Sequence, residues 1–205
     1  MPVTNPTNGK SIVNTDSNVT AQILLDGASE ILGTELVQKV FQRIGHEDIA
    51  IDRGVRNVPV RLQVGPFIQA LAEIYGEAGS RGLALRIGRA AFQYGLKKYG
   101  DQAGFRAMEF RLLPAPRRLE SGLRSLAQIV ERECGGKIQV SDEGAYWQWR
   151  VTRQAATQDC FLIAGLLQEF TYWAGGGRFY RVEETECQAC GSLACTYRIE
   201  KRPLD

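Results

Sequence analysis

Residues 137–152 read KIQVSDEGAYWQWRVT, and this stretch decides the fold class. Polar and apolar residues alternate on both sides of Asp142-Glu143-Gly144, which is the pattern of two antiparallel strands joined by a tight turn. Trp147 and Trp149 lie two residues apart, so they share one face of the second strand. The stretch therefore predicts a β-hairpin with an aromatic face.

The chain that follows repeats the hairpin after one helix. An apolar helix is expected from Asp159 to about Trp173, because Gly175 to Gly177 would end it. Residues 178–187 and 194–201 then predict a second hairpin. The order hairpin, helix, hairpin, preceded by five helices, predicts an α+β fold: an antiparallel sheet of two hairpins flanking a helix, packed against several helices.

Apolar residues three and four apart, interrupted by glycine and proline, predict helices in the first two thirds of the chain. The expected helices span about 17–33, 34–45, 67–78, 81–99 and 119–134. We expect three parts: a flexible arm at 1–16, an N-terminal helical hairpin and connector at 17–63 that serves as a dimerisation element, and a ligand-binding domain with a metal site at 64–205.

Charge and hydropathy exclude several classes of protein. The net charge of +2 is too small for the whole chain to bind nucleic acid electrostatically, so we expect no nucleic-acid partner. The longest apolar run, Phe161–Leu167, is far shorter than the roughly 20 residues of a transmembrane helix. The first residues lack the pattern of a secretory signal. Five cysteines, an odd number, favour reduced thiols and a cytoplasmic location.

The densest chemistry lies at residues 184–195, which read ETECQACGSLAC. Three thiols and several carboxylates near a hairpin turn could hold one tetrahedral ion, and Zn²⁺ readily takes cysteine sulfur together with carboxylate oxygen. Cys160, in the first turn of the preceding helix, could supply a further thiolate. A site filled by protein ligands would be structural rather than catalytic. The alternative is a set of buried, reduced cysteines without a metal.

The block ending in Glu184-x2-Cys187-x3-Gly191-x3-Cys195 resembles the 4-vinyl reductase domain family over about residues 65–201. Relatives of that family include sensor domains of phenol-responsive activators and, in fold, TRAPP subunits. The resemblance implies structural Zn²⁺ and a role in bacteriochlorophyll biosynthesis, where the single-domain members act. It assigns the metal ligands as Cys160, Glu184, Cys187 and Cys195.

One difficulty concerns the ligands on the strand. Glu184 and Cys187 would point to opposite faces of a regular strand, so both can bind one ion only if the strand bulges or ends between them. Cys190 could otherwise replace Glu184 as a ligand.

The expected function is therefore that of a zinc-containing binding protein for a hydrophobic small molecule, possibly a tetrapyrrole, acting as carrier or accessory factor. The alternatives are a divinyl (proto)chlorophyllide 4-vinyl reductase and a TRAPP-like assembly module. No Gly-x-Gly-x-x-Gly follows a strand, so no nucleotide site for a reductase is visible. We expect a homodimer, formed through the N-terminal helical hairpin.

Three other features of the sequence are candidate binding sites. The single histidine, His46, follows a helix stop and is expected at the surface. Residues 81–118 contain nine basic and two acidic side chains, a local charge of +7, which would attract an anion unless it is only a solvated helix face. Aromatic residues gather around the first hairpin and the following helix, where most are expected in the core and some could line a pocket: Trp147, Trp149, Phe161, Phe170, Tyr172 and Trp173.

Overall fold

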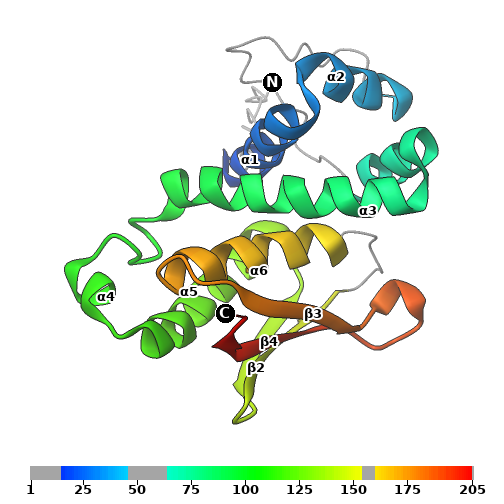
Figure 1. The fold of residues 1–205 in the computed structure, drawn as a ribbon. Coiled ribbons are helices and arrows are strands. Elements are labelled where there is room, and N and C mark those ends of the chain that lie inside the picture. Colours follow the sequence, from blue (N-terminus) through cyan, green and yellow to red (C-terminus); the bar gives the residue numbers. More distant parts are fainter. Residues whose placement is uncertain (1–14, 46–63, 154–159, 205) are drawn as a thin grey trace, which may run out of the picture.

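The computed structural model describes residues 15–45, 64–153 and 160–204. It is an α+β arrangement in which helices cover a four-stranded antiparallel sheet (Figure 1). Most of the arm expected at 1–16, the connector at 46–63 and His46 lie outside these residues. The helices are α1 (Thr15–Leu32), α2 (Thr34–Arg43), α3 (Val64–Tyr99), α4 (Met108–Leu112), α5 (Ala115–Cys134) and α6 (Cys160–Ala174). The strands are β1 (Lys137–Asp142), β2 (Tyr146–Thr152), β3 (Tyr180–Glu186) and β4 (Cys195–Pro203), with a 3₁₀ turn η1 (Gln188–Cys190).

The two predicted hairpins are confirmed, and they join into one sheet. β1 pairs with β2 around Gly144, whose φ of 76° suits the left-handed position of a tight turn. β3 pairs with β4, and β2 pairs with β4, so the strand order is β1-β2-β4-β3. The expected α+β class with one antiparallel sheet is therefore confirmed.

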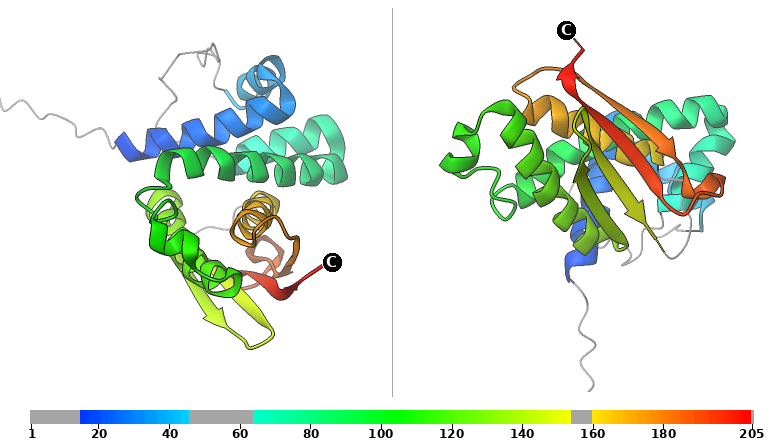
Figure 2. Two further views of the ribbon diagram at one scale, coloured as in Figure 1. Left: turned by 60° about the vertical axis from the view of Figure 1, so that its left-hand side comes forward. Right: turned by 90° about the horizontal axis from the view of Figure 1, so that it is seen from below.

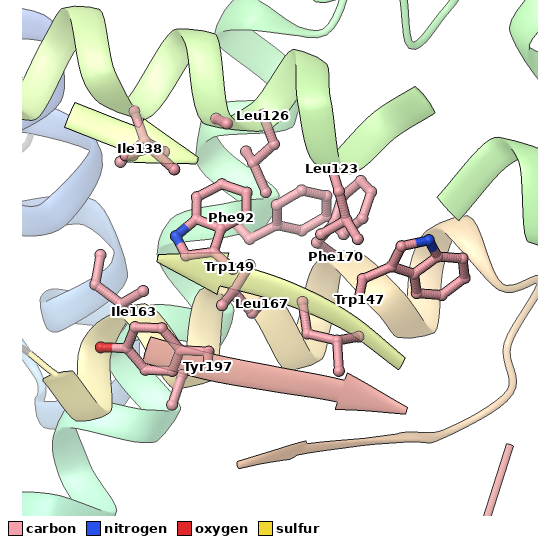
Figure 3. Packing of buried hydrophobic residues seen from close by; sticks show 14 of the residues in the cluster. Phe92, Leu123, Leu126, Ile138, Trp147, Trp149, Ile163, Leu167, Phe170 and Tyr197 are labelled. Atoms are coloured by element: carbon pink, nitrogen blue, oxygen red, sulfur yellow. The ribbon is translucent and has the colours of Figure 1, made fainter. Parts of the chain in front are cut away.

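One face of the sheet is buried. Trp147 and Trp149 of β2 lie opposite Ile199 and Tyr197 of β4, and all four side chains are buried. All four belong to one hydrophobic cluster, and Figure 3 shows Trp147, Trp149 and Tyr197 beside side chains of α5 and α6 such as Leu123 and Leu167. The residues between them on the strands are partly or fully exposed, as expected for an antiparallel sheet that faces water on one side.

Helices α3 and α6 pack unusually closely. A Cβ atom added at Gly88 of α3 would lie 2.1 Å from the carbonyl oxygen of Leu162, and one added at Gly165 of α6 would lie 2.1 Å from that of Leu85. The backbones of α3 and α6 are therefore in direct contact at both glycines. Figure 2 shows α3 in the middle of the molecule. The pair α1 and α2 lies on one side of α3, and α6 lies on the other side, with the sheet beyond α6.

The N-terminal helical hairpin is present, and its apolar face is used inside the chain. Val37, Val40 and Phe41 of α2 are buried in one cluster with Leu24 of α1 and Leu71 of α3. A homodimer formed through this apolar face has no support in the structure, because the face is already covered.

The predicted break between two central helices is real, but its position was wrong. The helical stretch Val64–Tyr99 is interrupted at Gly76, which has φ 72° and ψ 169°, rather than near residues 79–80. Only glycine adopts that conformation readily, so Gly76 sets the kink.

Candidate metal centre

Four side chains predicted as metal ligands come together at one end of the sheet. They are Cys160, Glu184, Cys187 and Cys195. Each offers one ligand atom, a sulfur or a carboxylate oxygen, and these four atoms all lie within 4.8 Å of one another. Cys160 begins α6, Glu184 lies in β3, Cys187 follows β3 and Cys195 begins β4. Figure 1 shows the start of α6 and the β3–β4 turn at the same end of the molecule.

The distances between the sulfur atoms suit a shared ion. Cys160 Sγ lies 3.4 Å from Cys187 Sγ and 3.5 Å from Cys195 Sγ. In a tetrahedral thiolate centre with bonds of about 2.3 Å the sulfurs are roughly 3.8 Å apart. A shift of a few tenths of an ångström would therefore complete the coordination.

The difficulty with the strand geometry is resolved by an irregularity in β3. The pairing with β4 shifts register between Glu184 and Glu186, and the strand ends at Glu186. Cys187 therefore lies beyond the regular ladder and can turn toward the same point as Glu184. The side chain of Cys190 is exposed, whereas Glu184 is half-buried, which favours Glu184 as the ligand.

Several hydrogen bonds hold these side chains in place. The backbone N–H of Gln188 donates to Cys195 Sγ at 3.3 Å, and the hydroxyl of Tyr197 donates to the Cys160 carbonyl at 3.1 Å. The Gln188 amide also donates to the carbonyl of Arg153 at 2.8 Å, which ties η1 to the end of β2. The site is thus positioned by hydrogen bonds outside the ligand set, as metal sites require.

Burial raises the pKa of two of the thiols. It is the largest cause that raises the pKa of Cys160, with the neighbouring Glu184 carboxylate adding to it. Burial also raises the pKa of Cys195. Both thiols are therefore neutral at pH 7 in the chain alone, and a metal ion would have to displace their protons.

The other sequence candidates are dispersed. Trp147, Trp149 and Phe170 are buried in the core, while Tyr172 is exposed on α6. The basic residues of 81–118 are distributed over α3, the α3–α4 connection, α4 and α5, and some are paired: Arg81 with Glu77, and Arg106 with Asp101.

The fold is that of H-NOX domains. No family model and no curated protein matches the chain. Among solved structures, an H-NOX protein from S. oneidensis in its Fe(II)NO ligation state matches with a TM-score of 0.63 at 12% identity, over 92% of this chain and 99% of that one. An oxygen-binding H-NOX domain related to soluble guanylate cyclases matches with a TM-score of 0.59 at 12% identity, over 92% and 97%. An H-NOX domain from Shewanella oneidensis in the Fe(II)CO state gives a TM-score of 0.61 at 13% identity, over 90% and 97%.

These matches overturn the resemblance to the 4-vinyl reductase domain family. All the neighbours above are H-NOX domains, so the expected role in bacteriochlorophyll biosynthesis, with its reductase and TRAPP-like alternatives, was wrong. Zn²⁺ as the expected cofactor was wrong on the same ground, because two of these neighbours carry Fe(II) and a further matching structure is described by its heme redox potential. The resemblance rested on the order hairpin, helix, hairpin and on the spacing of Glu184, Cys187, Gly191 and Cys195, which together do not determine the family.

Heme is the group that the neighbours imply, and the described residues do not fit it. They contain no histidine, because His46 lies outside them. The backbone contacts at Gly88 and Gly165 leave no room for a porphyrin between α3 and α6. The adjoining space is filled by aromatic rings with centroids 5.2–6.4 Å apart: Phe92, Phe105, Phe110, Phe170 and Trp173.

Among the described residues, no helix is long and apolar enough to cross a membrane.

Proposed function

We propose that this chain is a regulatory binding domain of the H-NOX fold in which a metal–thiolate centre takes the place of heme. Three thiolates and one carboxylate, from Cys160, Cys187, Cys195 and Glu184, would bind one thiophilic transition-metal ion. Sulfur-rich ligand sets select such ions over hard, oxygen-seeking ones. Because no ligand position is left for a substrate, the ion's role is to hold elements together rather than to catalyse.

The observation that carries this proposal is the carboxylate of Glu184. Its Oε1 atom is buried and has no hydrogen-bond partner, although it lies among three thiols. Buried polar atoms are nearly always satisfied, because leaving one unpaired costs about 1–3 kcal/mol. A bound cation would satisfy this oxygen and would compensate the charge of the thiolates around it.

Binding an ion would join three parts of the fold. Cys160 fixes the start of α6, Glu184 and Cys187 fix the end of β3, and Cys195 fixes the start of β4. A change in the occupancy of this site would therefore alter how α6 sits on the sheet. That coupling is the physical basis for assigning a regulatory role.

The test is a titration of the reduced, metal-free chain with Co²⁺, which reports thiolate ligation by its charge-transfer absorption. We expect one ion per chain, tetrahedral cobalt bands, and release of protons from the thiols. Apparent affinity should fall as the pH is lowered, because protons compete with the ion for neutral, high-pKa thiols. Absence of the thiolate bands would contradict the proposal.

A second expected result concerns heme. Hemin added to the full chain should give no saturable Soret band, because the described core offers neither an axial histidine nor space for a porphyrin. A saturable Soret band that disappears in His46→Ala would contradict this expectation. It would mean that the chain binds heme through His46. The two titrations use the same protein and can be run side by side.

The site also bears on where the protein works. Metal-binding thiols must stay reduced, so the proposal places the chain in the cytoplasm. The homodimer stays a prediction that light scattering of the purified chain would test.

A further inference from the structure

A groove lies between α3, α6, the start of β3 and the end of β4. Its volume is about 240 Å³, and its walls include Arg89, Gln168, Tyr172, Phe179, Arg181 and Leu204. A cavity of about 150 Å³ holds benzene, so this groove has room for one or two fused rings. Its residues are separate from the metal centre, so binding in the groove is independent of the proposed function.

Exposed apolar side chains converge on the groove. Of seven large hydrophobic side chains exposed among the described residues, three line it: Tyr172, Phe179 and Leu204. The rings of Tyr172 and Phe179 lie 4.8 Å apart, and that of Phe179 is 58% exposed. Apolar surface left in water costs free energy in proportion to its area, and gathered into a pocket it marks a binding site.

The walls of the groove are fixed by backbone contacts. The N–H of Leu204 donates to the Phe179 carbonyl at 2.9 Å. The N–H of Gly177 donates to the Tyr172 carbonyl, also at 2.9 Å. A Cβ atom at Gly175 would lie 2.3 Å from the ring of Tyr180, so this glycine admits the ring that lines the groove. The groove is therefore largely preformed, which lowers the cost of binding.

Its charged groups favour an anion. Two arginines and one glutamate line the groove: Arg89, Arg181 and Glu169. Glu169 accepts a hydrogen bond from Gln93 at 2.6 Å. Arg89 donates through Nε and Nη2 to Gln168 Oε1, at 3.1 and 2.6 Å, which fixes its guanidinium plane and leaves Nη1 for a ligand. Arg181 pairs with Glu183 at 3.1 Å, but both side chains are at least half exposed, so that pair is readily exchanged.

We propose that this groove binds a small aromatic carboxylate, with its ring against Tyr172 and Phe179 and its carboxylate between Arg89 and Arg181. Planar rings stack on exposed aromatic faces, and a guanidinium group matches a carboxylate in charge and geometry. The ligand class is thus defined by one or two rings and one negative charge.

The probes for the test are 1-naphthoate and the neutral 1-naphthalenemethanol, which share a ring system. Titrations of the full chain followed by two-dimensional amide NMR should show saturable shifts with naphthoate at residues of the groove. Because a hydrogen bond to a charged group is worth roughly 1.5–3 kcal/mol, the neutral probe should bind about tenfold or more weakly. Arg181→Gln should weaken naphthoate binding by a similar factor, and Phe179→Ala should weaken both probes.

Matched controls separate this site from general attraction to a basic surface. Arg86→Gln changes another exposed arginine of α3, and Tyr75→Ala removes an exposed ring of the same helix, and neither residue lines the groove. Both variants should bind naphthoate as the unmodified chain does. The proposal is overturned if naphthoate gives no saturable shifts, if the neutral probe binds equally well, or if the control variants weaken binding as much as Arg181→Gln does.

Discussion

Cys160→Ser is expected to abolish thiolate binding of Co²⁺ and to remove any metal-dependent increase in Tm. Cys160 is buried, and its sulfur lies within 3.5 Å of the sulfur atoms of both Cys187 and Cys195. It therefore occupies the middle of the cluster. A hydroxyl is a much poorer ligand for a thiophilic ion than a thiolate. Loss of this one sulfur should therefore empty the whole site.

The size of the stability effect follows from linkage. A metal present at 100 times its Kd stabilises the folded chain by about 2.7 kcal/mol, provided that the unfolded chain does not bind it. For a chain of this length each kcal/mol shifts Tm by about 2–4 °C, so the ion should raise Tm by about 5–11 °C. Thermal unfolding with and without Co²⁺, under reducing conditions, measures this difference. Cys160→Ser should show no difference.

Cys190→Ser is the matched control, because it makes the same chemical change three residues after Cys187. Its thiol is exposed and outside the cluster of four, so binding and the rise in Tm should be kept. Glu184→Gln should weaken binding without abolishing it, because the three sulfurs remain. If Cys190→Ser instead loses the ion while Glu184→Gln keeps it, the fourth ligand is Cys190 and the assignment of Glu184 is wrong.

The sequence could predict the hairpins because their evidence is local. Alternating residues around Gly144 and the shared face of Trp147 and Trp149 need no knowledge of the rest of the chain. The joining of the hairpins through β2 and β4 could not be predicted in the same way, because it depends on long-range pairing. What covers the apolar face of the N-terminal helices could not be predicted either. Its periodicity in the sequence is the same whether α3 or a second chain covers it.

A metal site among these cysteines was expected from side-chain chemistry, the set of four ligands was assigned by the family resemblance, and the structure brings those four residues together. The spacing of cysteines indicated that thiols would meet at a hairpin end, but the bulge that lets Glu184 and Cys187 face one point is a backbone irregularity without a clear sequence signal. The family assignment failed because a motif of four positions carries little information about a fold of this size. The groove beside Tyr172 was missed because Arg89, Phe179 and Leu204 are far apart in sequence.

Gly88→Ala should destabilise the chain more than any other single-methyl addition in α3. The new Cβ atom would lie 2.1 Å from the Leu162 carbonyl oxygen, which is backbone and cannot rotate away. Overpacking of this kind costs about 3 kcal/mol, which corresponds to a fall in Tm of about 6–12 °C.

Gly82→Ala is the matched control, because nothing lies within 4 Å of its added Cβ. It should stabilise the chain by about 0.5–1 kcal/mol, since alanine favours helix over glycine. Chemical denaturation of the two variants measures both changes.

The same substitution tests whether helix packing and the metal centre are coupled. Leu162 lies two residues after Cys160, so pushing its carbonyl away from α3 must also move the start of α6. Gly88→Ala should therefore weaken Co²⁺ binding, whereas Gly82→Ala should leave it unchanged. Equal affinity in the two variants, with Gly88→Ala still folded, would mean that α6 carries no signal from the metal centre to α3. In that case the centre would be a local clamp on the sheet, and the regulatory part of the proposed function would be wrong.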